Sequence, residues 1–437
     1  MITIAVITIF CLFALIFMGV HIGFALSIMS FIGVWLMSGK LSVALSIMAT
    51  TSFEAIRDYV FAVLPLFVLM GAFMSHSGAA RDLFNASNFF VRKLPGGMGV
   101  ATVVANAIFA AVTGVSVASA AVFSKICLPE MSRLNYDKKF ALGAVAGSSV
   151  LGMLIPPSVL FIIYGMTAEQ SIGKLFVAGI IPGLILSGMY SILIIGMCMW
   201  KPEIGGRGAA QLADAHDDNE KALKVMIQAL PVVALVVLVL GGIWGGLFTP
   251  TEASAVGALG AMLVGLMKKL SLKKIKEVLL ETAATTSAIL LLLIAAQMYS
   301  RMLAMSGLIA ELGNAVANSG VASWVVMTCL FILLLVLGCI LDSVSILLLT
   351  VPLILPIAAK LGWDLIWLGV VMVIVTEMGL LTPPFGMVVF SVKATIGDAV
   401  KLEDIFRGSM PFLAVMFIFS LIVIAFPILS TYLPSLM

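Results

Sequence analysis

Residues 338–345 read Gly-Cys-Ile-Leu-Asp-Ser-Val-Ser and lie inside an apolar run, 319–359, in which Asp342 is the only formal charge. This run is longer than the roughly 20 apolar residues that a helix needs to cross a bilayer, yet it has almost no polar loop in which to turn. We therefore expect a re-entrant hairpin over 320–358, in which two short helices meet at a tip inside the protein. Bare backbone at such a tip is tolerated only beside protein or water, so its oxygens are available to bind a cation.

A second long apolar stretch, 94–128, has the same character and turns around residues 113–119, which read Thr-Gly-Val-Ser-Val-Ala-Ser. Each expected hairpin is followed by a span with adjacent prolines, Pro156-Pro157 in the first case and Pro383-Pro384 in the second. Adjacent prolines remove two backbone donors and disfavour helix in the preceding residue. Both spans are therefore expected to be broken helices. They cover residues 140–164 and 365–391.

The two hairpins belong to an internal repeat, because five short matches occur in one order at an offset of 227 or 229 residues. Five crossings between Gly78 and Gly307 would make the second copy upside down relative to the first. Inverted repeats with Gly/Pro-interrupted segments are typical of secondary transporters and mark their binding sites. The matches are Ser77-Gly78 with Ser306-Gly307, Thr113 with Asp342, Leu128-Pro129 with Leu355-Pro356, Leu154-Ile155-Pro156-Pro157 with Leu381-Thr382-Pro383-Pro384, and Gly179 to Pro182 with Gly408 to Pro411.

The composition places the chain in a membrane. Of its 437 residues, 62% are hydrophobic and 10% are charged, whereas soluble domains are about 45–50% apolar and about 25% charged. This excludes a soluble enzyme, a nucleic-acid-binding module and a disordered scaffold. The apolar runs lack strand-like alternation, which favours helices over a barrel.

The chain is thus predicted to be an all-α polytopic membrane protein with five segments. They are scaffold spans over 1–93, a first repeat core over 94–200, a polar linker over 201–224, further scaffold spans with a basic loop over 225–319, and a second repeat core over 320–437. The basic loop contains Lys268, Lys269, Lys273, Lys274 and Lys276. By the positive-inside rule this loop faces the cytoplasm.

Asp342 is the most informative single residue for function. A charge at membrane depth costs roughly 2.5–3.5 kcal/mol on insertion scales, and such residues mark ion or substrate pathways. We expect Asp342 to bind a cation, and a helix-capping role is compatible with that function. Glu377 is the next candidate, for which capping or packing is an equal alternative. The chain has neither a GxxxxGK[ST] nor an HExxH motif, so an ion gradient would have to supply the energy for transport.

Several motifs together resemble the large membrane subunit of tripartite ATP-independent periplasmic (TRAP) transporters over essentially the whole chain. The resemblance implies a bacterial inner-membrane, sodium-coupled importer of carboxylates or related acids with an elevator-type fold. It also implies a small four-span membrane subunit and a periplasmic substrate-binding protein as partners, and no nucleotide or organic cofactor. The motifs are Pro65 to Gly71, Thr113-Gly114, Ile155 to Ser158, Leu175 to Gly183, Phe248 to Ala253 and Leu381 to Gly386.

The same resemblance implies two sodium sites and a site for the organic acid. The first sodium site would involve Thr113, Gly114, Ser116, Ser119, Ser149 and Pro156. The second would involve Gly338, Asp342, Ser343, Ser345, Thr382 and Pro383. The acid would contact Thr113, Ser158, Asp342 and Thr382. One departure is that the family often has Ser-Gly-Ser at the first tip, whereas Val115 here lacks the third residue's hydroxyl.

Three alternatives remain open from the sequence. A self-sufficient sodium/anion symporter of similar inverted-repeat design would share these motifs. A channel would conduct without saturation or gradient coupling, and an intramembrane enzyme would need a paired nucleophile and base, which the sequence does not offer. Dicarboxylates, sugar acids, keto acids and sulfonates all fit as the transported acid.

Overall fold

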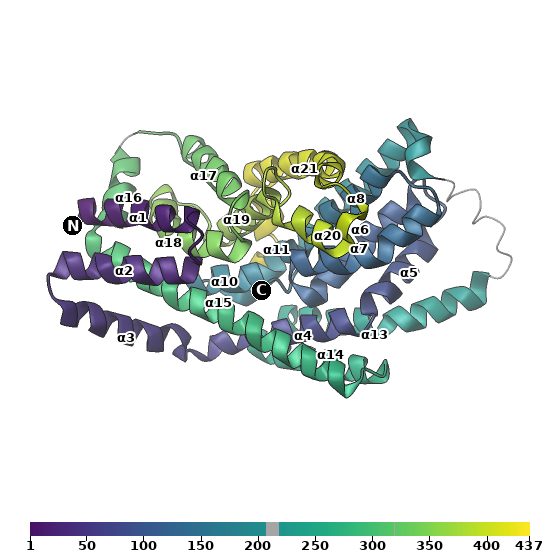
Figure 1. Cartoon of the computed structure of the whole chain (residues 1–437), viewed down its shortest axis with the longest axis horizontal. Coiled ribbons are helices and arrows are strands. Elements are labelled where there is room, and N and C mark those ends of the chain that lie inside the picture. The colour runs from purple at the N-terminus through teal and green to yellow at the C-terminus, as the bar shows by residue number, and fades with distance from the viewer. Residues whose placement is uncertain (207–217, 319) are drawn as a thin grey trace.

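The computed structural model describes residues 1–206, 218–318 and 320–437, and all regular elements among them are helical (Figure 1). Residues 207–217 of the expected polar linker lie outside the described part. The first eleven helices are α1 (Ile2–Phe17), α2 (Ile22–Ser38), α3 (Leu41–Arg57), α4 (Val63–His76), α5 (Ala79–Val91), α6 (Gly97–Thr113), α7 (Ser116–Arg133), α8 (Lys138–Ser149), α9 (Leu151–Leu154), α10 (Val159–Thr167) and α11 (Ile172–Trp200). The later ones are α13 (Asp218–Trp244), α14 (Pro250–Met267), α15 (Leu272–Ser306), α16 (Leu308–Asn318), α17 (Ser323–Gly338), α18 (Ser343–Leu361), α19 (Leu365–Gly379), α20 (Met387–Ile396), α21 (Leu402–Ala425) and α22 (Ile428–Thr431).

Eight helical segments in the described part of the chain are long and apolar enough to cross a membrane. The prediction of an all-α polytopic fold is thereby confirmed. Five apolar helices are shorter, at 15 to 17 residues, and they include α6 and α17. These two helices are the first arms of the expected hairpins, and their length suits segments that enter the protein and turn back.

The scaffold is organised along α15, which at 35 residues is the longest described helix and runs diagonally beside α2, α3 and α4 (Figure 1), while α14 packs on α4. Ion pairs connect the helix ends here, since Lys268 contacts Asp82 and Arg301 contacts Glu54. The His76 Nε2 atom also lies 2.9 Å from a carboxylate oxygen of Glu281 on α15. α15 ends at Gly307, which has a φ of 77° and forms a left-handed cap.

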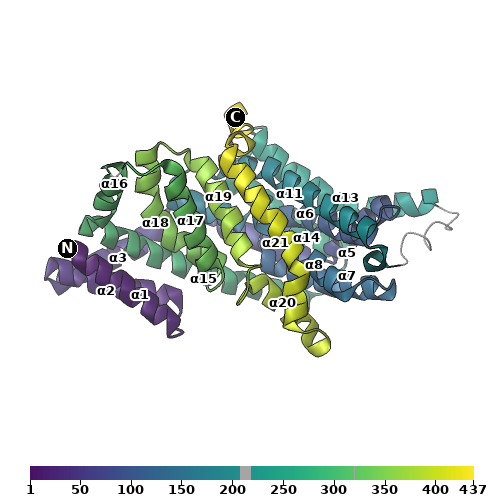
Figure 2. The ribbon, with the colours of Figure 1, turned by 90° about the horizontal axis from the view of Figure 1, so that it is seen from above.

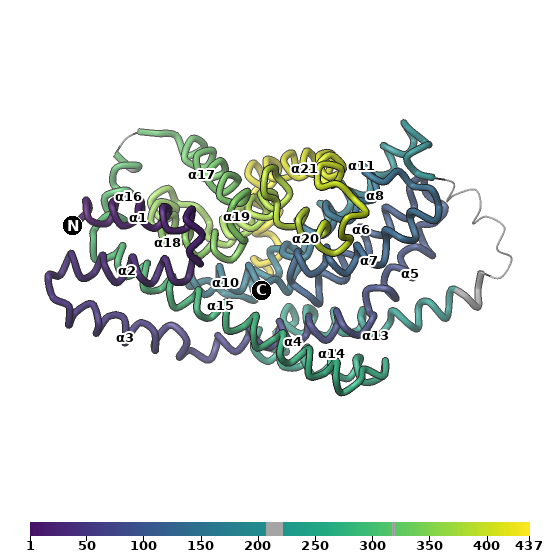
Figure 3. The backbone as a smooth tube through the Cα atoms, viewed as in Figure 1, coloured from purple at the N-terminus to yellow at the C-terminus, as the bar shows by residue number. Residues whose placement is uncertain are grey.

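The two helix pairs approach the middle of the molecule from opposite ends of its long axis. The tube view shows α6 and α7 towards the right and α17 and α18 towards the left (Figure 3). The half-helix after each break packs on the second arm of the other repeat's pair, because α10 contacts α18 and α20 contacts α7. A hydrogen bond of 3.0 Å from the Ser391 hydroxyl to the Val117 carbonyl fixes the second of these crossings.

A glycine pair brings α8 and α21 into backbone contact, and Figure 2 shows these helices side by side. A Cβ atom on Gly143 would lie 1.9 Å from the Gly408 carbonyl oxygen. One on Gly408 would lie 2.0 Å from the Lys139 carbonyl oxygen. Only residues without a side chain fit at this crossing, which joins the first broken helix to the last long helix of the second repeat.

Candidate functional site

The tip of the first helix pair is a two-residue turn between Thr113, the end of α6, and Ser116, the start of α7. Gly114 has a φ of 62°, a left-handed conformation that residues with a side chain adopt at a cost. Its carbonyl oxygen accepts a hydrogen bond of 3.3 Å from the Val159 N–H. A Cβ on Gly114 would lie 2.6 Å from the Pro157 carbonyl oxygen. The tip is therefore seated directly on the first Pro-Pro break.

The first break separates α9 from α10 and is completely buried. Ile155 is extended, with a φ of −81° and a ψ of 122°, and Ser158 caps α10 by accepting a hydrogen bond of 3.4 Å from the Phe161 N–H. The Ser158 hydroxyl also donates to the Met153 carbonyl. Both polar functions of this predicted acid-binding hydroxyl are thus engaged with the backbone of its own segment.

Of the predicted first sodium site, the structure brings Thr113 and Ser119 into contact at this tip. The Thr113 hydroxyl donates to the Phe109 carbonyl at 3.0 Å and lies 3.5 Å from the Ser119 hydroxyl. Ser149 lies on α8, where the Nδ2 atom of Asn106 is 3.4 Å from the Ser149 oxygen. The Oδ1 atom of Asn106 is buried without a hydrogen-bond partner. A cation could use this free oxygen, since hard cations in proteins are held by oxygen ligands.

The second tip joins Gly338, the end of α17, to Ser343, the start of α18. Asp342 is half-buried and caps α18, accepting a 3.0 Å hydrogen bond from the Ser345 N–H and another from the Ser345 hydroxyl. Gly338 meets Gly379 of α19, because a Cβ on Gly338 would lie 2.7 Å from the Gly379 Cα. The capping role expected as an alternative for Asp342 is therefore present.

The second break, residues 380–386, differs from the first because Pro383, Pro384 and Phe385 are exposed. The Thr382 hydroxyl donates to the Met378 carbonyl at 2.9 Å, within its own helical turn. No described hydrogen bond joins Thr382 to Asp342 or Ser345, so the structure does not bring these predicted partners into polar contact. Both Pro-Pro peptide bonds are cis.

Glu377 connects the two tips and is the residue that sequence reasoning underrated. It lies on α19 with its side chain fully buried. One carboxylate oxygen accepts a hydrogen bond from the Ser116 hydroxyl, and the other accepts one of 2.9 Å from the Ser343 hydroxyl. Ser116 and Ser343 are the first residues of α7 and α18, so the carboxylate lies at the N-termini of two helices. The sequence feature that could have indicated its importance is that Glu377 is the only charge between Asp364 and Lys393.

Asn106 is a further candidate site residue that the sequence analysis did not predict. Its Nδ2 atom donates to the Ser148 hydroxyl at 2.7 Å and thereby joins α6 to α8 behind the first tip. The sequence feature that could have indicated it is that Asn106 is the only carboxamide in the apolar run 94–124. Thr376, one residue before Glu377, likewise has a buried hydroxyl oxygen without a partner. Asn106 and Thr376 therefore each place a buried oxygen without a described partner on a helix that leads into a tip or a break.

The described residues contain no group of three His, Cys, Asp or Glu side chains that could hold a metal ion. A cation bound near the tips would therefore be held mainly by backbone, hydroxyl and amide oxygens.

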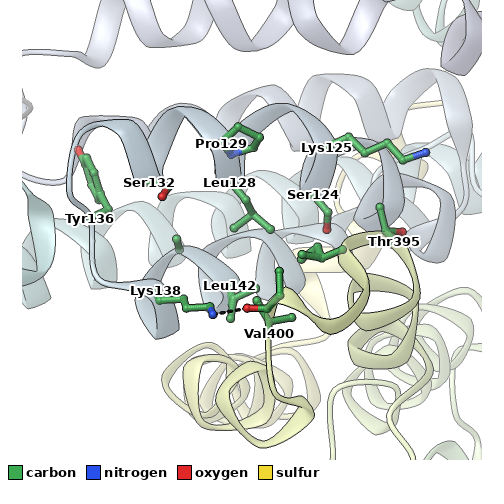
Figure 4. Close-up of a pocket in the computed structure, with 13 residues that line it drawn as sticks. Ser124, Lys125, Leu128, Pro129, Ser132, Tyr136, Lys138, Leu142, Thr395 and Val400 are labelled. Atoms are coloured by element: carbon green, nitrogen blue, oxygen red, sulfur yellow. Dashed lines mark hydrogen bonds between the residues drawn. The ribbon is translucent and has the colours of Figure 1, made fainter.

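A pocket of about 590 Å³ lies away from the tips, between α7, the start of α8 and the end of α20. Figure 4 shows the Ser124 and Ser132 hydroxyls directed into it, and the Lys138 ammonium donates to the Ala399 carbonyl. Burial raises the pKa of the Tyr136 hydroxyl above its ordinary value, and this oxygen accepts a 3.4 Å hydrogen bond from the Met98 N–H. None of the predicted site residues lines this pocket.

We expect Gly114→Ala to loosen the first tip. The left-handed conformation of this residue would cost about 1–2 kcal/mol with any ordinary side chain, and the new methyl group would clash with the Pro157 carbonyl. Transport should fall strongly while the protein still folds, because the change affects only the turn. Gly78→Ala is the matched control, since Gly78 has a φ of 82° and nothing within 4 Å of its Cβ position. Equal transport in the two variants would contradict a functional role for the seated tip.

Comparison with known proteins places this geometry in context. A family model described as "Tripartite ATP-independent periplasmic transporter, DctM component" matches residues 9–429. The C4-dicarboxylate TRAP transporter large permease protein DctM of Pseudomonas aeruginosa is 33% identical over 390 residues, covering 89% of each chain. The sialic acid TRAP transporter large permease protein SiaM of Vibrio cholerae is 30% identical and covers 98% of each chain.

Two further similarities concern chain organisation and fold. The isethionate TRAP transporter permease protein DctMQ of Oleidesulfovibrio alaskensis is 30% identical over 90% of this chain, which covers 60% of that relative. Among solved structures, the Alcanivorax borkumensis YdaH transporter, described as having an unusual topology, matches with a TM-score of 0.51 and 15% identity over 88% of each chain. At this identity the second similarity concerns the fold alone.

Proposed function

The chain belongs to the DctM component family of TRAP transporters, and from this membership we propose that it imports an organic acid across the bacterial inner membrane by sodium symport. It is the large permease subunit of such a transporter. The observation that carries the proposal is the convergence of two helix-pair tips and two proline-broken helices on one buried centre. Convergence of interrupted helices at the midplane is how secondary transporters build ion and substrate sites.

We propose two sodium sites built on the tips. The first would use oxygens of Thr113, Gly114, Ser116, Ser119, Ser149 and Pro156, with the free Asn106 oxygen as an additional ligand. The second would use Gly338, Asp342, Ser343, Ser345, Thr382 and Pro383. Bound sodium would supply positive charge next to the acid. Asp342 would supply the one carboxylate of the second site while it holds the start of α18 in place.

The acid would bind where α7 and α18 begin, beside Thr113, Ser158, Asp342 and Thr382. The N-terminus of a helix favours an anion because its free N–H groups and its dipole point towards the ligand. The first residues of both helices bond the same Glu377 carboxylate, so their N-termini face one centre. With Glu377 and Asp342 present, an anion would gain from sodium binding first, which would make the two binding events cooperative.

Selectivity for an acidic substrate is supported by the relatives' names. Three of the relatives, at 30% to 33% identity, are named for C4-dicarboxylates, sialic acid and isethionate, which are all organic anions. We propose that a periplasmic binding protein delivers the acid and that a small membrane subunit completes the transporter. The tips and broken helices would then move together as an elevator against the scaffold of α2, α3, α4, α14 and α15.

Sodium binding can be tested without knowledge of the acid. We expect NaCl, but not KCl at equal ionic strength, to raise the melting temperature of the purified subunit, because a ligand that binds only the folded state stabilises it. Thr382→Ala should remove most of this sodium effect. Thr350→Ala is the matched control, since each hydroxyl donates to the carbonyl four residues earlier, and Thr350 lies outside the proposed sites. Equal shifts with sodium and potassium would contradict the sodium proposal.

A further inference from the structure

Glu377 is an unusual buried carboxylate because one of its oxygens accepts a hydrogen bond from the tip of the first repeat and the other accepts one from the tip of the second. Its side chain has no exposed surface, and none of the ion pairs in the described part of the chain includes it. The closest residue of formal charge along the tips is Asp342, which neighbours Ser343 and has the same sign. Two hydroxyl groups and two helix N-termini are therefore the stabilising groups that surround this carboxylate.

The two serines are committed to Glu377 in a way that their neighbours are not. The described hydrogen bond of the Ser116 hydroxyl goes to Glu377, and so does that of Ser343. By contrast, the Ser119 hydroxyl lies 3.5 Å from Thr113 in its own tip, and the Ser345 hydroxyl donates to Asp342 in its own tip. Each tip therefore contains one serine that reaches across to α19 and one that stays within the tip.

Burial of a carboxylate is favourable only while its hydrogen bonds are satisfied. If one serine loses its hydroxyl, the closed arrangement holds a half-satisfied carboxylate out of water. Opening of either tip would then be easier, because water could reach the carboxylate and replace the lost donor. A hydroxyl on one tip consequently stabilises the closed state of the other tip, although the two tips belong to different repeats.

We propose that Glu377 is a positioning residue that couples the closure of the two tips, through Ser116 on one side and Ser343 on the other. This inference rests on the proposed function in one respect, namely that the tips enclose the transport site. With this coupling, the closure equilibrium of each tip depends on whether the other tip is closed. A coupling of this kind between sites is typically worth about 5- to 150-fold in an equilibrium.

The test uses cysteine reporters in the full-length subunit, with its five native cysteines replaced, in membranes that also contain its small partner subunit. Val344→Cys reports on the second tip and Val115→Cys on the first, since both positions are half-buried next to the serines. The measured quantity is the rate of labelling by N-ethylmaleimide in the absence of any acid. It is recorded in sodium-containing and in sodium-free medium.

We expect Ser116→Ala to accelerate labelling at position 344 by about 5- to 150-fold, whereas Ser124→Ala, which removes another buried hydroxyl of α7 outside the proposed sites, leaves this rate unchanged. In the reverse direction, Ser343→Ala should accelerate labelling at position 115, and Thr350→Ala, on α18 but outside the proposed sites, should not. Introducing Glu377→Leu, which removes both acceptor oxygens, should raise labelling at both positions and abolish the effect of Ser116→Ala on position 344.

The coupling is refuted if Ser116→Ala and Ser124→Ala have equal effects on the second tip, or if the cross-tip effect persists with Glu377→Leu. A folding defect in Glu377→Leu does not prevent this decision, because the four hydroxyl variants give the comparison on their own. The proposed sodium function is judged separately. If sodium leaves labelling unchanged at both reporters while the cross-tip effects remain, the function proposal fails and the coupling stands.

Discussion

Replacing Asp342 by alanine is expected to abolish sodium-dependent uptake while the transporter still assembles. Asp342 is the only carboxylate of the proposed second sodium site and the only charge in the apolar run that forms the second helix pair. Its loss should weaken sodium binding by about 10- to 100-fold, the range found when groups around a bound metal are removed. The measurement is sodium-driven uptake of the acid into proteoliposomes that contain both membrane subunits and the binding protein.

A second variant separates the charge from the helix cap. Alanine also removes the hydrogen bond that the Ser345 N–H donates to the Asp342 carboxylate, which costs about 0.5–2 kcal/mol at an N-cap. Asn is as good a cap as Asp but is neutral. We expect Asp342→Asn to keep the melting temperature of the parent protein and still to lose sodium-dependent transport. Full sodium-dependent transport by either variant would show that Asp342 serves only as a cap.

Replacing Gly143 by alanine is expected to prevent the core from assembling. A Cβ atom there would lie 1.9 Å from the Gly408 carbonyl oxygen and 2.4 Å from the carbonyl carbon, so helix α21 itself would have to move. Overpacking of a well-packed core costs about 1–3 kcal/mol and occasionally more. A clash with backbone belongs at or above the upper end of this range, because no flexible side chain can give way.

The yield of monodisperse protein and its melting temperature measure this effect. Gly188→Ala is the control, because Gly188 is also helical, on α11, but has nothing within 4 Å of its Cβ position. We expect the control to be neutral or slightly stabilising, since alanine is the better helix former. If Gly143→Ala gave the same yield and melting temperature as the control, the close α8–α21 crossing would be wrong.

The positions of the tips could be predicted from the sequence because apolar length and small polar residues determine them. The turns predicted at 113–119 and 338–345 contain the observed gaps between α6 and α7 and between α17 and α18. The ends of the pairs were less predictable. α7 continues through Pro129 to Arg133, and α18 includes Pro352 and Pro356. A single proline is tolerated inside these packed helices, whereas the adjacent prolines coincide with real breaks.

Contacts between distant segments could not be read from the sequence. Glu377 accepts a hydrogen bond from Ser116, which lies 261 positions away. No local sequence pattern around a charge in an apolar span identifies such a distant partner. The breaks illustrate the same limit, since both have the Pro-Pro motif but only the second is exposed. Burial there depends on which helices cover the break. The predicted sodium and acid sites remain predictions, although Thr113 and Ser119 of the first group are in contact.

The reciprocal packing of α10 on α18 and of α20 on α7 has a consequence for biosynthesis. The Val117 carbonyl on α7 is bonded by Ser391, which is translated 274 residues later. The first hairpin is therefore synthesised long before α20, which packs on it in the complete fold. Until then its polar turn must be surrounded by lipids, the insertion machinery or a partner subunit. Completion of the core is a late event, set by the arrival of the last quarter of the chain at the ribosome exit.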